Sequence, residues 1–233
     1  MKSALKGELK VQSHYDEIAD VYDQRYDHRD RGRQYYDHIA QAVMNQIGTG
    51  GELLDIGCGT GSLAMRLSPC GAHIHGLDLS SEMVRIARDK VRAAEVTNVT
   101  FHVGPFDQSF TMFEDESLRG ICAYSLLHLA DDLPGTLRRI FRLLEPGGFF
   151  VSSTVCLGES RVPYGPLLRI MRTLGKAPTV NMFSKRTLEN EVKLGGFVDI
   201  VQPDVGAKPI IAFMVATKPR LADCHGEARA ADR

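Results

Sequence analysis

The sequence is poor in cysteine and nearly balanced in charge. Its 233 residues include only five cysteines, which are scattered and form no C-x-x-C pair. An odd, dispersed set of this kind argues against a disulfide framework or a structural zinc site, and favours free thiols in a reducing compartment. The formal net charge is -1, so no overall basic field holds the chain on nucleic acid or on an anionic membrane.

Long apolar runs are missing as well. None approaches the roughly 18 residues of a membrane-spanning helix, and the opening MKSALKGELK lacks the apolar segment of a signal peptide. We therefore expect a cytoplasmic protein without stable membrane association. With 43% hydrophobic and 24% charged residues, the composition is that of a globular chain with a sizeable core.

What the sequence does contain is a regular alternation of strand-like and helix-like segments. Apolar runs predict strands at residues 52–57, 73–79, 99–104, 118–126, 148–156, 198–204 and 210–217. Amphipathic spacing predicts helices at residues 11–24, 33–47, 81–94, 131–144 and 185–194, the fourth of them ended by the Pro-Gly-Gly at 146–148. Such alternation is typical of an α/β domain whose parallel sheet is covered on both faces. The two helices before the first strand are candidates for a lid over the carboxyl ends of the strands, where ligands of such sheets bind.

A glycine-rich stretch, LLDIGCGTGS at 53–62, follows the first predicted strand. It departs from the dinucleotide fingerprint G-x-G-x-x-G, because Ser62 occupies the last glycine position and Gly61 comes one residue early. Asp55 is a second departure, since a carboxylate at the loop repels a pyrophosphate and attracts an ammonium group. The pattern predicts a ligand with a cation close to the loop.

A second acid, Asp78, ends the next predicted strand in HIHGLDLS. It lies about 20 residues beyond the loop, where a carboxylate can accept both hydroxyls of a ribose. A ribose joined to a cationic amino acid points to S-adenosylmethionine.

These segments carry a family resemblance. LLDIGCGTGS followed by GLDLS resembles motifs I and II of the class I S-adenosylmethionine-dependent methyltransferases. Residues 115–132 resemble the family's fourth-strand region, 137–154 its helix and fifth strand, and FSKRTLENEVKLGGF its last helix before the antiparallel hairpin. The likeness covers roughly residues 51–218. It implies an α/β, Rossmann-like, seven-stranded mixed sheet of order 3-2-1-4-5-7-6, with the last strand antiparallel, helices on both faces and N-terminal lid helices.

The N-terminal HYDEIADVYDQRYD resembles the opening of small-molecule members of the family, including the quinone-biosynthesis type. That likeness implies that Tyr15 and Tyr22 touch the methionine end of the cofactor; alternatively they only pack the helix onto the sheet. We expect three parts, namely a helical lid at 1–48, a methyltransferase domain at 49–218 and a flexible tail at 219–233. Within the domain, 158–183 is expected to be an acceptor-side insertion, with packing on the sheet or contact with a membrane surface as alternatives.

The resemblance also assigns roles to single residues. The three loop glycines would admit the methionine moiety, Asp55 would attract its ammonium group, Asp78 would hold the ribose and Leu79 would line the adenine. Many relatives carry Gly-Asp after the third strand, where this chain has Gly-Pro-Phe-Asp, so Asp107 either receives the adenine amino group from a shifted position or is an exposed loop acid. The expected cofactor-binding residues are Tyr15, Tyr22, Asp55, Gly57, Cys58, Gly59, Gly61, Asp78, Leu79, Phe106, Asp107 and Tyr124.

The implied activity is in-line transfer of a methyl group from S-adenosylmethionine to a small, partly apolar acceptor, leaving S-adenosylhomocysteine. His128 is the candidate catalytic base, with a structural histidine as the alternative. No metal is expected, because His73 and His75 have no third ligand at convincing spacing. Other hypotheses are a regulatory or scaffold protein that binds the cofactor without transfer, a nucleic-acid methyltransferase and, more distantly, a nicotinamide dehydrogenase. The acceptor and the oligomeric state stay open.

Overall fold

A computed structural model describes residues 2–26, 30–48, 50–107, 109–160 and 180–220. Within these residues seven strands form one sheet of order β3-β2-β1-β4-β5-β7-β6. The strands are β1 (Glu52–Ile56), β2 (His73–Asp78), β3 (Val99–Val103), β4 (Leu118–Tyr124), β5 (Leu144–Val155), β6 (Val198–Val201) and β7 (Ile211–Thr217). The first five run parallel, and β7 is antiparallel to both of its neighbours. The predicted fold and strand order are confirmed.

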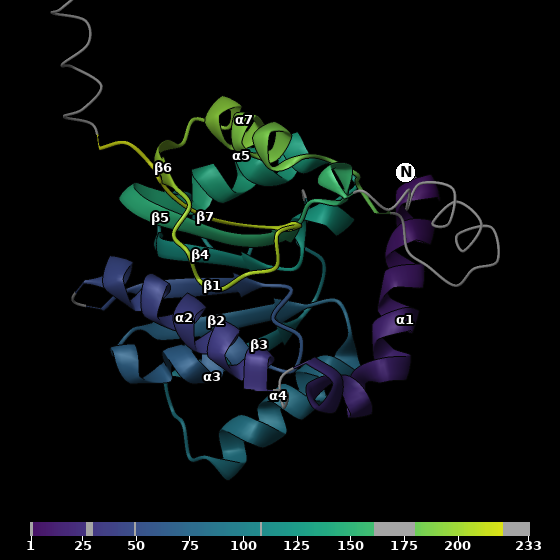
Figure 1. Ribbon diagram of the computed structural model, residues 1–233. Helices are drawn as coiled ribbons and strands as arrows, with labels where there is room; N and C mark the ends of the chain where they lie inside the picture. Colours follow the sequence, from purple (N-terminus) through teal and green to yellow (C-terminus); the bar gives the residue numbers. More distant parts are fainter. Residues whose placement is uncertain (1, 27–29, 49, 108, 161–179, 221–233) are drawn as a thin grey trace, which may run out of the picture.

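Helices cover both faces of the sheet (Figure 1). α2 (Asp30–Ile47), α3 (Ser62–Leu67) and α4 (Ser81–Ala93) pack on one face, and α5 (Leu133–Leu143) and α7 (Lys185–Leu194) on the other. Because side chains alternate along a strand, Leu53 joins the apolar cluster that contains Val43 of α2, whereas Leu54 joins the cluster that contains Leu137 of α5. The central strands are therefore buried on both sides, as the parallel part of such a sheet requires.

The helices that precede the sheet are held in different ways. α2 buries a row of aliphatic side chains in the core, its Tyr35 hydroxyl shares a 2.7 Å hydrogen bond with Ser153 Oγ on β5, and Arg119 donates to the last carbonyls of α2. α1 (Lys2–Tyr26) stands across one end of the sheet (Figure 1). Among its described side chains only Ala19 is buried, so apolar burial contributes less to its attachment.

Several predicted boundaries differ from the structure, and two of these differences have a clear position in the fold. α1 begins at Lys2, well before residue 11. α5 ends at Leu143 rather than at the Pro-Gly-Gly, because Leu144 already pairs with Leu118 as the first residue of β5. The Pro-Gly-Gly instead lies within β5, where the register to β4 shifts and Gly147 has a φ of +81°. Burial of Leu144, fully shielded from solvent, thus outweighs the local tendency of proline and glycine to end a strand.

Most of the predicted insertion at 158–183 and of the tail at 219–233 lies outside the described residues. In the described part of the chain, no helix combines the length and the apolar character needed to cross a membrane.

Candidate functional site

A cavity of about 980 Å³ lies at the carboxyl ends of β1, β2 and β4, where open parallel sheets bind their ligands. α1 contributes one wall, and the others come from the loops after β1, β2, β3 and β4, from α5 and from Tyr36 of α2. The predicted residues that line it are Tyr15, Tyr22, Asp55, Gly57, Cys58, Gly59, Asp78, Leu79, Phe106, Asp107 and Tyr124. Gly61 and His128 are not part of the lining.

Asp55 is a buried carboxylate without a partner. It lies near the end of β1, in register with Gly76 of β2 and Cys122 of β4, and only 2% of it is exposed. Neither carboxylate oxygen has a hydrogen-bond partner among the residues that the structure describes. Burial, and to a lesser extent the charge of Asp78, raises the pKa of Asp55 to about 7. A buried carboxylate in a cavity is costly unless a cation or donor meets it, so this residue fits the ammonium end of an amino acid.

The glycine loop uses its backbone donors within the protein. The amides of Gly57 and Cys58 donate to the carbonyl of Leu77 at 2.7 and 3.1 Å, and the amide of Gly61 donates to the carbonyl of Cys58 at 3.0 Å. The amide of Gly59 donates to Asp78 Oδ2 at 2.8 Å. A phosphate-binding loop points its amides at the ligand, and here four of them are engaged elsewhere. The geometry disfavours a dinucleotide.

Two loop glycines meet different surroundings. Gly59, with a φ of +53°, has nothing within 4 Å of the position a Cβ would take, so its bare side is open. A Cβ at Gly61 would lie 2.6 Å from Phe101 Cζ and 3.1 Å from Ala87 Cβ. Gly61 therefore allows α4 and β3 to pack against the loop, which is a different role from the one the resemblance assigns to it.

Asp78, one strand over from Asp55, is well supplied with donors. Its Oδ1 accepts from the amide of Ser80 at 2.9 Å and its Oδ2 accepts from the amide of Gly59 at 2.8 Å. Burial raises the pKa of Asp78, and these amide bonds oppose that rise. A carboxylate has about four acceptor positions, so Asp78 can still accept from two ligand hydroxyls.

Four tyrosines form an aromatic wall of the same cavity. The rings of Tyr15 and Tyr22 on α1 meet edge to face at 6.4 Å, and those of Tyr36 and Tyr124 lie 4.7 Å apart. All four tyrosines line the cavity, together with aliphatic side chains such as Leu126. Tyr36 was not predicted, although its place on the apolar stripe of a helix before the first strand is a usable signal.

The loop after β3 supplies Phe106 and Asp107. Phe106 packs against Phe110 at a centroid distance of 5.3 Å, with the guanidinium of Arg139 at 5.8 Å from its ring. Asp107 is exposed and accepts from the amide and hydroxyl of Ser109 at 2.7 and 2.6 Å. Both predicted residues reach the cavity, but the carboxylate of Asp107 is also tied to its own turn.

His128 lies on the short helix η2 (Leu127–Leu129) after β4. Burial lowers the pKa of His128 to about 4, and its Nδ1 has no partner in the described part of the chain. The imidazole is therefore neutral at physiological pH, and it lies outside the cavity lining.

The histidines at the start of β2 bond to neighbouring side chains. His73 Nε2 contacts Thr100 Oγ1 at 3.1 Å, and His75 contacts His102 and Glu52. Over the described ranges, no group of three or more histidine, cysteine or acidic side chains is placed to hold a metal ion.

Comparison with known proteins gives a consistent result. The family model described as "Methyltransferase domain" matches residues 53–148. Demethylmenaquinone methyltransferase of Symbiobacterium thermophilum is 29% identical over 167 residues, which are 70% of this chain and 63% of that protein. For three curated relatives the match covers 53%, 63% and 74% of their own length.

Solved structures are similar in fold. The [4+2]-cyclase SpnF has a TM-score of 0.70 at 18% identity, over 90% of this chain and 96% of that one. Phosphoethanolamine N-methyltransferase 2 of Haemonchus contortus, in complex with S-adenosyl-L-methionine, has a TM-score of 0.65 at 20% identity, over 87% of this chain and 60% of that one.

The fold and the cavity define a Rossmann-like protein whose cavity, at the carboxyl ends of the strands, is lined by Asp55, Asp78 and the glycine loop. The comparisons then name a class: residues 53–148 match a methyltransferase domain, and the chain is similar to class I S-adenosylmethionine-dependent methyltransferases.

Proposed function

We propose that the protein transfers a methyl group from S-adenosylmethionine to a small, partly apolar molecule. The observation that carries the proposal is Asp55, a buried carboxylate without a partner among the described residues, at a cavity whose glycine loop keeps its amides for internal bonds. A ligand with a cation and no phosphate at this position suits both features.

The cofactor would be held by residues on neighbouring strands. Asp55 binds its ammonium group, Asp78 accepts from the ribose hydroxyls, and Leu79 and Phe106 line the adenine. Tyr15, on α1, lies on the methionine side. When bound, S-adenosylmethionine supplies a methyl group that its sulfonium already activates. The chain's own contribution is then to orient the acceptor and to exclude water, and positioning of this kind supplies several kcal/mol.

The acceptor would lie against the aromatic wall. Tyr36, Tyr124, Leu126 and Leu129 are uncharged and lie on the cavity, which supports an acceptor with an apolar part. The curated relatives named demethylmenaquinone methyltransferase also support a small molecule. His128 would serve an acceptor that must lose a proton, but a neutral imidazole with a pKa of about 4 is a weak base.

The parts of the chain follow from this proposal. Residues 1–48 would close over the cofactor as a lid, residues 49–218 would bind it, and residues 158–183 would contact the acceptor. α1 carries the lid hypothesis, because four of its residues, Val11, Gln12, Tyr15 and Tyr22, line the cavity.

A second candidate is binding of S-adenosylmethionine without methyl transfer. One observation favours it, namely that a structure of very similar fold is named a cyclase. Fold alone does not choose between these activities.

Incubation with methyl-labelled S-adenosylmethionine and a metabolite extract tests the proposal. We expect label to move into a small molecule, and expect S-adenosylhomocysteine to form in equal amount. The matched control is the Asp55→Asn variant, which keeps the side-chain volume and removes the charge. Binding of S-adenosylhomocysteine by calorimetry without label transfer to any extract component would favour the second candidate, and no binding at all would reject both.

A further inference from the structure

α1 is attached to the rest of the protein by a row of acids. Asp16, Asp20 and Asp23 are spaced four and three residues apart, so they lie on one face of the helix. This face turns toward α4 and toward the glycine loop, as the contacts of each acid show. Asp16 and Asp23 each directly follow a cavity-lining tyrosine, Tyr15 or Tyr22.

Asp23 closes a ring of polar contacts with the glycine loop. Thr60 Oγ1 donates to Asp23 Oδ1 at 2.5 Å, and Lys90 Nζ of α4 pairs with Asp23 Oδ2 at 2.5 Å. Lys90 Nζ also donates to the carbonyl of Thr60 at 3.0 Å. Thr60 is 2% exposed and lies between Gly59 and Gly61. Both the backbone and the side chain of this loop residue are thereby fixed by one carboxylate and one ammonium group.

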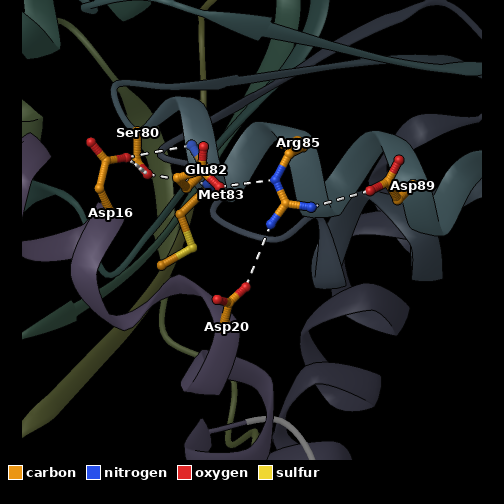
Figure 2. A network of polar contacts seen from close by, with 7 residues as sticks. All are labelled: Asp16, Asp20, Ser80, Glu82, Met83, Arg85 and Asp89. Atoms are coloured by element: carbon orange, nitrogen blue, oxygen red, sulfur yellow. Dashed lines mark hydrogen bonds and ion pairs between the residues drawn. The ribbon is translucent and has the colours of Figure 1, made fainter.

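Asp16 makes the equivalent contact at the second cofactor loop (Figure 2). Ser80 Oγ donates to Asp16 Oδ1 at 2.5 Å, and the amide of Glu82 reaches the same oxygen at 3.4 Å. A carboxylate is favoured here, because this is the N-terminus of α4. Ser80 is completely buried, and its amide donates to Asp78 Oδ1. Asp16 therefore acts on the residue that holds the carboxylate of Asp78.

Asp20 offers the contrast. It lies between the other two acids on the same face, but it is 86% exposed and pairs only at 3.5 Å with Arg85, which itself pairs with Glu82 and Asp89 (Figure 2). An exposed pair of this kind contributes little. The same helix thus supplies a matched control for both half-buried contacts.

We propose that Asp16 and Asp23 are positioning residues that fix the two cofactor-binding loops and couple the seating of α1 to cofactor binding. They act through Ser80 and Thr60, which line the cavity, whereas Asp16 and Asp23 do not. The inference rests on the proposed function for the identity of the ligand. The contacts themselves are independent of it.

Calorimetric titration with S-adenosylhomocysteine tests the coupling. The variants Asp23→Asn and Asp16→Asn each lose charge-assisted hydrogen bonds to a loop, so we expect their affinity to fall by about tenfold. Asp20→Asn should bind within about twofold of the wild type. Asp23→Glu, which keeps the charge, should recover part of the loss. Equal affinity of all four variants and the wild type would overturn the proposal.

Hydrogen exchange of the ligand-free protein separates this inference from the proposed function. Asp23→Asn should speed exchange in the loop at 57–61, and Asp16→Asn should do so at 78–83, while Asp20→Asn leaves both unchanged. If the wild type bound no S-adenosylhomocysteine, the proposed function would be rejected. The hydrogen-exchange rates of the variants would then still decide whether Asp16 and Asp23 position the loops. Unchanged loop exchange, or faster exchange throughout the chain with a lower melting temperature, would contradict that role.

Discussion

Two buried acids near the carboxyl ends of the strands differ in their hydrogen-bond partners. Asp55 lies on β1, Asp78 lies on the adjacent parallel strand β2, two residues beyond the register partner of Asp55, and burial raises the pKa of both. Asp78 accepts two backbone amide bonds, one from each of the loops that surround it. Asp55 accepts none from the residues that the structure describes.

The difference separates two ways of using a carboxylate. The amide bonds to Asp78 fix the glycine loop and the start of α4 in the ligand-free protein. Burial of the unpaired Asp55 carboxylate costs free energy, and binding of a cation would offset this cost. In the proposed function, Asp78 therefore shapes the site and Asp55 binds the cationic group of the ligand.

The largest expected effect comes from Asp55→Asn. Removing one charge of a buried pair costs about 3 to 5 kcal/mol, so affinity for S-adenosylmethionine should fall at least about 100-fold. Without ligand the same variant should be more stable at pH 8, by about 1 to 3 kcal/mol, since an uncompensated charge is removed. Calorimetry and chemical denaturation measure the two effects. Unchanged affinity of Asp55→Asn for S-adenosylmethionine would contradict the role proposed for Asp55.

Asp78→Asn should act in the opposite direction on stability. Its side chain has one acceptor oxygen and a nitrogen that cannot accept, so one of the bonds from Gly59 and Ser80 is lost and the free energy of unfolding of the ligand-free protein should fall by about 1 to 3 kcal/mol. Affinity for S-adenosylmethionine should fall about thirtyfold, corresponding to about 2 kcal/mol for the weakened ribose contacts. If both Asn variants shifted stability with the same sign, the contrast between the two acids would be wrong.

The pH dependence of binding sharpens the comparison further. With a pKa of about 7, Asp55 is half protonated at neutral pH, and a cationic ligand binds its ionised form. Affinity should therefore rise roughly eightfold between pH 6 and 7.5, with release of a proton, and Asp55→Asn should flatten this rise.

Ionisation of Asp55 should have the opposite effect on stability, which should fall as pH rises. Because its folded pKa is raised above the ordinary value of 3.8, Asp55 lowers the free energy of unfolding of the ligand-free protein progressively as pH rises from about 4 to about 7. Denaturation of wild type and Asp55→Asn across this window isolates the contribution. A difference between the two proteins that does not depend on pH would contradict the assignment.

The smallest effect is expected at His128. Its pKa of about 4 makes it neutral across pH 6 to 8, so His128→Gln should lower the rate of methyl transfer less than about threefold, whereas loss of a general base costs about 10² to 10⁴. A loss in that larger range, together with a vanished inflection in the pH–rate profile, would establish His128 as the base predicted from sequence.

Much of the fold, and the position of the two acids in it, could be predicted from local sequence patterns and from the family resemblance. The strands, their order and the placing of Asp55 and Asp78 at strand ends followed from apolar runs and from the resemblance carried by LLDIGCGTGS and GLDLS, and the cavity brings both acids together. These features depend on residues close in sequence, or on a topology with few alternatives.

Features set by distant contacts could not be predicted. Gly61 meets Phe101 of β3, forty residues away, and no glycine pattern reveals which side of a loop the sheet will cover. The end of α5 depended on pairing of Leu144 with β4. The roles of Asp16 and Asp23 required the docked position of α1, although the Tyr-Asp pair repeated seven residues apart was a visible signal.

The glycine loop has a consequence for competition among metabolites. ATP and NAD share adenine and ribose with the proposed cofactor, and Asp78, Leu79 and Phe106 would accept these groups equally well. Next to the ribose, however, ATP and NAD carry negatively charged phosphates. The phosphates would meet the Asp55 carboxylate and backbone amides that already donate to Leu77, Cys58 and Asp78. In the proposed function, selectivity against ATP and NAD would thus come from backbone amides that the glycine loop keeps for internal hydrogen bonds.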